Sequence, residues 1–160
     1  QQLAKTTLSN ILNNFYSQRQ IRVIQEDNNG WIWVGTSAGV YIFNPDSLMN
    51  DPDNYITYNY NNGKLRSNEI KCIHQDSKGR IWVGTSGKGF SMCMPEGDYR
   101  NLTFEHYDGS DGLVNSMVQS IVEDREGKLW VATEYGISRF DPDTHAFENF
   151  FFSAYSHYSL

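Results

Sequence analysis

The chain has 160 residues, of which 39% are hydrophobic and 20% are charged, so its length suits one domain and its composition argues against a disordered chain. Nucleic-acid-binding domains are usually basic, whereas this chain has a net charge of −6. No apolar run approaches the roughly 20 residues that a membrane-spanning helix needs. We therefore expect no nucleic acid and no membrane contact for this segment.

The first residues do not predict a single structure. The chain begins at Gln1, without an initiator Met or a signal-peptide pattern, so we expect it to be processed or cut from a longer protein. Residues 1–18 form either a tail or the remnant of a preceding repeat. Leu8, Ile11, Leu12 and Phe15 have helical spacing, but the nearby asparagines are poor helix formers, and both a helix and a strand remnant stay open.

Three copies of one sequence unit occupy most of the remaining chain. Each copy contains the pattern Asp-x-x-Gly-x-[Ile/Leu]-Trp-Val, with its Asp, Gly and Trp at equal offsets. The Asp residues lie 49 and 48 positions apart (76 − 27 and 124 − 76). The repeated residues, to which we assign a structural role in turns and core, are Asp27, Gly30, Trp33, Asp76, Gly79, Trp82, Asp124, Gly127 and Trp130.

Each unit reads as four short strands. The first strands are expected at 21–24, 70–73 and 118–121, and the second strands at 32–34, 81–83 and 129–131. The third strands are expected at 39–43, 89–93 and 136–140, each closed by a turn containing Pro, and the last at 55–60, 102–107 and 147–152. Asp and Gly in the first hairpin suit a tight turn, and the second strand is apolar on both faces, as in a strand between two sheets.

Units of about 48 residues with four antiparallel strands each predict an all-β fold of β-propeller blades. We place blade 1 at 19–64, blade 2 at 65–112, blade 3 at 113–152 and a C-terminal tail at 153–160. Closed propellers have four to eight blades, so three blades make an incomplete propeller with two open faces. Other blades of a parent propeller, or a second copy of the chain in a homodimer, are the expected partners.

The unit resembles the two-component regulator propeller repeat, which builds the periplasmic sensor region of bacterial hybrid two-component sensor histidine kinases. Trp-Val-Gly-Thr followed by Gly is intact at 33–36 with Gly39 and at 82–85 with Gly89, while the third copy has Ala132 in place of Gly. The resemblance implies a periplasmic sensor segment, anchored through its parent to the inner membrane. It also implies detection of glycan-derived oligosaccharides and signalling to a histidine kinase by phosphorelay.

Propellers bind ligands on loops at one mouth of the channel, which the repeat does not fix. The loops that enter the first strand and those between the second and third strands should share this face. Arg, Lys, Asn, Glu and Tyr side chains there suit sugar hydroxyls and an aromatic stacking surface. The candidate ligand-binding residues are Arg19, Arg66, Asn68, Lys88, Asn115, Glu134 and Tyr135.

The sequence offers no catalytic, metal or cofactor motif. The glycine-rich stretch 84–89 lacks the spacing of a P-loop and lies at a strand-to-strand turn, and the four histidines lack metal-ligand spacing. The acidic pairs at 26–27 and 123–124 lie on separate hairpins, so a glycosidase pair is not expected. Cys72 and Cys93 lie two strands apart, about 9–10 Å, beyond disulfide reach, and are expected to be small core residues.

We therefore expect a non-enzymatic sensor segment without a cofactor. The main alternative is a propeller scaffold for protein–protein interaction or dimerisation without a small ligand. A propeller hydrolase or lyase is a third, weaker alternative, which would release reducing ends from a saccharide.

Overall fold

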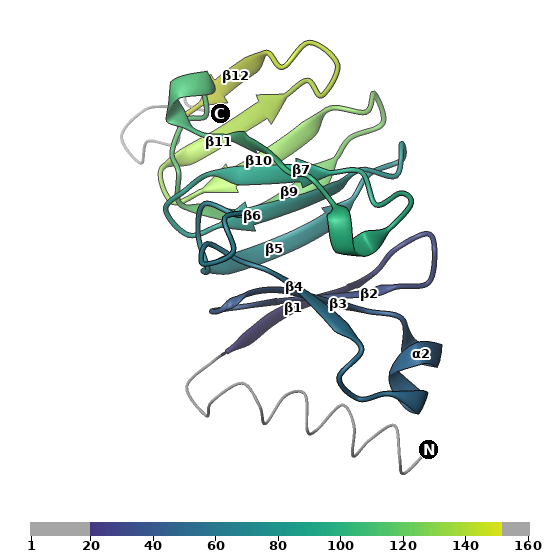
Figure 1. Ribbon diagram of the computed structural model, residues 1–160. Coiled ribbons are helices and arrows are strands. Elements are labelled where there is room, and N and C mark those ends of the chain that lie inside the picture. The colour runs from purple at the N-terminus through teal and green to yellow at the C-terminus, as the bar shows by residue number, and fades with distance from the viewer. Residues whose placement is uncertain (1–19, 152–160) are drawn as a thin grey trace.

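The computed structural model describes residues 20–151, and the expectations for residues 1–18, for Arg19 and for the tail at 153–160 lie outside the described residues. Three four-stranded antiparallel sheets follow one another along the chain, and each sheet keeps its strands in sequence order. Figure 1 shows the sheets stacked face to face as successive blades. The predicted all-β fold of three blades is confirmed.

The strand bounds agree closely in the three sheets. The strands of blade 1 are β1 (Ile21–Glu26), β2 (Ile32–Thr36), β3 (Gly39–Phe43) and β4 (Tyr55–Tyr58). The strands of blade 2 are β5 (Ile70–Gln75), β6 (Ile81–Thr85), β7 (Phe90–Cys93) and β8 (Glu105–Tyr107). The strands of blade 3 are β9 (Val118–Glu123), β10 (Leu129–Thr133), β11 (Gly136–Phe140) and β12 (Phe147–Phe150).

The hairpin between the first two strands of each blade is built around its Asp side chain. In blade 1 the carboxylate of Asp27 accepts hydrogen bonds from the amides of Asn29 (2.9 Å) and Trp31 (3.0 Å), and Gly30 takes the positive φ of +81°. The other oxygen of Asp27 accepts the indole N–H of Trp33 at 2.8 Å. One carboxylate therefore closes the turn and satisfies the buried indole, a pattern that blades 2 and 3 repeat.

Apolar side chains fill the space between neighbouring sheets. One core cluster joins blades 1 and 2 around Trp33, and a second joins blades 2 and 3 around Trp82. These two indoles are 0% and 1% exposed, whereas Trp130 of blade 3 is only partly buried. The difference arises because no described blade follows blade 3 and covers that face.

The segments after the third strands differ between blades 1 and 2. In blade 1, residues Pro45–Asn50 form the short helix α2, because Asn44 caps the amides of Asp46 and Ser47 and Pro45 occupies the first turn. Blade 2 instead has a 3₁₀ turn at Tyr99–Asn101, and a second one, Gly109–Asp111, follows β8. The repeat therefore fixes the strands and leaves these connections variable.

The two cysteines lie on strands separated by β6, and both are free thiols. Burial raises the pKa of Cys72 to about 12, and burial also raises the pKa of Cys93. Both therefore act as small, uncharged members of the inter-blade cores. Within residues 20–151, no helix has the length and apolar character needed to cross a bilayer.

Candidate functional site

Two sets of loops meet at one end of the blades. The amide of Ser37, between β2 and β3, donates to the carbonyl of Gln20 at 3.0 Å. The same bond recurs in blade 2 between Ser86 and Glu69 (2.9 Å), and in blade 3 between Glu134 and Met117 (3.1 Å). The loops entering the first strands and the loops between the second and third strands therefore share one face, as expected from the repeat.

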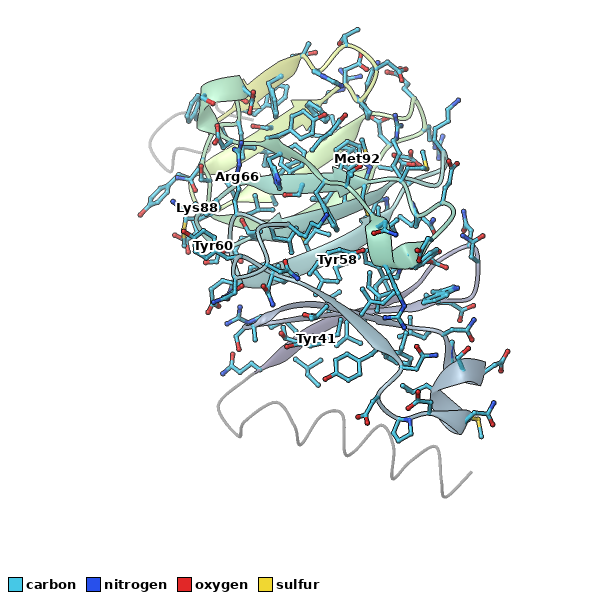
Figure 2. The ribbon with its side chains drawn as sticks, viewed as in Figure 1. Tyr41, Tyr58, Tyr60, Arg66, Lys88 and Met92 are labelled. Carbon is cyan, nitrogen blue, oxygen red and sulfur yellow. The ribbon has the colours of Figure 1, made fainter. Side chains whose placement is uncertain are left out.

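A pocket of about 470 Å³ opens on this face. Its lining comes from the segment that crosses from blade 1 to blade 2, from the β6–β7 turn and from the end of β8. The lining residues are Tyr60, Gly63, Leu65, Arg66, Lys88, His106 and Asp108. Figure 2 shows Arg66, Lys88 and Tyr60 close together at one edge of the molecule.

The crossing segment is held in place by its own polar side chains. The side chain of Asn68 accepts the amide of Tyr60 at 2.8 Å and donates to Asn61 at 2.9 Å. Leu65, which belongs to this segment, is buried in the core cluster between blades 1 and 2 and anchors the segment there. Asn68, a sequence candidate for ligand binding, therefore shapes the loop in this structure, and its side-chain bonds are directed within the loop.

Two cations and one carboxylate set the charge of the pocket. Arg66 forms an ion pair with Asp108 at 3.0 Å, while Lys88 is exposed and has no ion pair among the described residues. Hydrogen bonds from Ser110, and then the charges of Arg66 and Lys88, lower the pKa of Asp108 below its usual range. The pocket therefore carries a positive charge in excess of its carboxylate.

His106 is a partly buried residue of the pocket lining. Its Nδ1 atom lies 2.7 Å from the hydroxyl of Ser91 on the neighbouring strand β7. Burial, and secondly the nearby charge of Arg66, lowers the pKa of His106 below its ordinary value. The ring is therefore neutral at pH 7, so it offers a hydrogen-bonding edge to a ligand without adding charge.

The other sequence candidates lie outside this pocket. Asn115 uses its side chain to accept the amide of Met117 at 2.8 Å, and Glu134 and Tyr135 are exposed in the β10–β11 turn. The structure thus brings Arg66 and Lys88 together and leaves Asn115, Glu134 and Tyr135 apart from them.

Sequence reasoning missed Tyr60, His106 and Asp108 as pocket residues. His106 lies within β8 opposite Ser91, at the position that Thr57 holds in β4, whereas Tyr60 lies two residues beyond the end of β4. The two residues therefore reach the pocket from different positions in the repeat, and aligning the copies offers no common signal for them. Within the described part of the chain, no group of three or more His, Cys, Asp or Glu side chains could hold a metal ion.

The family model of the two-component regulator propeller matches residues 16–38, 64–87 and 112–135. Among solved structures, the extracellular domain of the hybrid two-component system BT3049 from B. thetaiotaomicron is 29% identical, with a TM-score of 0.66. This match covers 82% of the chain and 17% of that protein. A comparison with curated proteins gives no match.

Two further structures show the fold alone. The extracellular domain of the hybrid two-component system BT4673 from B. thetaiotaomicron is 22% identical over 81% of this chain and 18% of its own, with a TM-score of 0.65. PorZ, a surface component of the type-IX secretion system of Porphyromonas gingivalis, is 19% identical over 80% of this chain and 20% of its own, with a TM-score of 0.56. The chain thus spans a fifth or less of each of these three structures.

Proposed function

Because the chain carries three repeats of the two-component regulator propeller family, we propose that it is a segment of the ligand-sensing propeller of a hybrid two-component sensor. The structural relatives are extracellular domains of such systems, which supports an extracytoplasmic sensor segment. In a bacterial parent anchored in the inner membrane, this segment lies in the periplasm. It senses a ligand there and biases a histidine kinase between two signalling states.

The observation that carries the ligand part of the proposal is the pocket of about 470 Å³ on the loop face. Tyr60 is an exposed aromatic surface on which a sugar ring can stack, and Arg66, His106 and Lys88 offer hydrogen bonds to hydroxyl groups. The excess positive charge favours a saccharide that carries a carboxylate. The proposed ligand is therefore an acidic oligosaccharide released from a glycan, which is bound without chemical conversion.

Calorimetric titration with acidic and neutral oligosaccharides of equal length tests this proposal. An acidic oligosaccharide is expected to bind more tightly than its neutral counterpart, and Lys88→Ala should weaken that binding about tenfold, since a hydrogen bond to a charged group is worth about 1.5 kcal/mol. Lys78→Ala is the matched control, because Lys78 is an exposed lysine in the β5–β6 turn and lies outside this pocket. Equal effects of the two variants, or no preference for the acidic sugar, would contradict the proposed site.

A second assay on the same mixtures measures reducing ends. The sensor proposal requires that none be released during prolonged incubation with the bound saccharide. Release that depends on the protein would support the hydrolase or lyase alternative instead.

The scaffold alternative is favoured by the open face of blade 3. Val122 is exposed there, and the partly buried Trp130 stacks on Phe150 with ring centroids 5.6 Å apart. An apolar sheet face of this kind usually contacts another protein surface. A chain that binds no saccharide in the titration but self-associates through this face would be a scaffold and not a sensor.

A further inference from the structure

Among the described residues that line the pocket on the loop face, Asp108 is the acidic one. It follows β8 directly and begins the 3₁₀ turn Gly109–Asp111. Its side chain is 31% exposed and forms the ion pair with Arg66 at 3.0 Å. A ligand that reaches the cations of the pocket therefore also meets this carboxylate.

The 3₁₀ turn holds the carboxylate of Asp108 in place. Its Oδ1 atom accepts hydrogen bonds from the amide (2.8 Å) and the hydroxyl (2.6 Å) of Ser110, and the amide of Asp108 donates to Asp111 at 2.9 Å. Leu113, just beyond the turn, is buried in the core between blades 2 and 3. The carboxylate cannot turn away from a ligand without breaking this cap, so its position in the pocket is fixed.

The charges of the lining leave room for one anionic group. Arg66 and Lys88 contribute two positive charges and Asp108 one negative charge, while His106 is neutral at pH 7. The excess is therefore one positive charge. A single carboxylate on a ligand neutralises it, and a second anionic group would face Asp108 with no further cation in the lining to offset the repulsion.

Asp108 also keeps the capacity to accept one more hydrogen bond. A carboxylate has about four acceptor sites, and the described residues fill three of them: two bonds come from Ser110 and one from Arg66. The remaining site is on Oδ2, next to the guanidinium of Arg66. A sugar hydroxyl can donate a hydrogen bond there, whereas a sulfate ester has no proton to donate and brings a like charge.

From these contacts we propose that Asp108 is a specificity-determining residue, which accepts a hydroxyl of the bound saccharide and disfavours a second anionic group such as a sulfate ester. The preferred ligand is an unsulfated saccharide of a uronic acid, with one carboxylate in the pocket and free hydroxyls beside it. A fixed repulsive group of this kind is one of the two ways in which a site separates similar ligands. This inference rests on the proposed function, because it concerns the same pocket.

Calorimetric titration at one fixed ionic strength tests the proposal. The probes are a disaccharide of a hexuronic acid and an amino sugar, and the same disaccharide in its monosulfated forms. The unsulfated probe should bind on the order of tenfold more tightly than the monosulfated probes, which is the effect expected for two like charges in close but partly hydrated contact.

Two variants separate the charge of Asp108 from its role in the turn. Asp108→Asn removes the charge and keeps an oxygen that can accept the amide of Ser110, so the turn should persist. It also frees Arg66 to pair with an anion, so the ratio of the two affinities should fall from about ten to about one. Asp108→Ser should give the same ratio, since Ser also caps such a turn and carries neither a charge nor an amide.

Asp53→Asn is the matched control, because Asp53 is exposed in the loop between α2 and β4 and lies outside this pocket. It should leave the ratio of affinities unchanged. Circular dichroism of each variant checks that the blades remain folded.

The outcomes distinguish this inference from the proposed function. If the wild-type chain binds sulfated and unsulfated probes equally and Lys88→Ala weakens both, the pocket remains the ligand site and the role of Asp108 is overturned. A preference for the unsulfated probe that survives in Asp108→Asn overturns that role as well. If none of the probes binds, the inference falls together with the ligand part of the proposed function.

Discussion

The carboxylate of Asp76 should be among the most sensitive single positions in the fold. Its side chain is fully buried and accepts four hydrogen bonds: from the amides of Lys78 (2.9 Å) and Arg80 (3.0 Å), from Arg80 Nε (2.6 Å) and from the indole of Trp82 (2.8 Å). Replacement by Ala leaves the buried indole N–H without an acceptor and opens the hairpin turn. The exposed part of this turn can rehydrate, so the four bonds do not add in full.

We expect Asp76→Ala to lower the free energy of unfolding by about 4 kcal/mol. This figure takes about 1.5–3 kcal/mol for the charged bond to the indole, including its unsatisfied N–H, and about 1 kcal/mol for each backbone amide. Asp76→Asn retains an acceptor for the amides but presents an NH₂ group to the indole or to Arg80. Its loss should be about half as large, near 2 kcal/mol.

Urea unfolding followed by tryptophan fluorescence and by circular dichroism measures these losses. Asp124→Ala is the matched comparison, because Asp124 makes the same indole bond at 2.8 Å at a more exposed position on the open face. Water can replace its lost bonds, so the Asp124 variant should lose clearly less stability. Equal losses at the two positions, or a loss below about 1 kcal/mol for Asp76→Ala, would refute the reasoning from burial.

Three further outcomes are expected. Gly84→Ala should lower the free energy of unfolding in urea by about 1–3 kcal/mol, because its Cβ would lie 2.4 Å from Cys72 Sγ and 2.7 Å from Val118. Adding Cys72→Ser should recover part of this lost stability. Because the pKa of His106 is lower in the folded protein, acid protonates this ring more readily in the unfolded chain, and the free energy of unfolding should fall as the pH drops below 6.5. His106→Gln should show a smaller fall between pH 7 and 5. Cys72 and Cys93 should react with a thiol reagent only after urea unfolding, since burial keeps both protonated; rapid reaction of the folded protein would contradict this.

The candidate site was only partly within reach of sequence reasoning. The repeat identified the loops that share one face, and within them Arg66 and Lys88, because residues that the repeat leaves free stand out against those that it fixes. It could not show that the side chain of Asn68 hydrogen-bonds within the loop, or that Tyr60 and His106 line the same pocket. These relations depend on the path of a crossing segment, which has no fixed pattern.

The sequence by itself determined the blades. Asp, Gly and Trp at fixed offsets specify a hairpin through local bonds, and strands of three to six residues with apolar faces must stack against a neighbouring sheet. The tertiary structure alone decided how much each copy of the same residue is buried. Trp33 and Trp82 are enclosed and Trp130 is not, although their local sequences are alike, because burial depends on whether another blade follows in space. For the same physical reason, the side-chain caps between blades emerge only once the sheets are stacked.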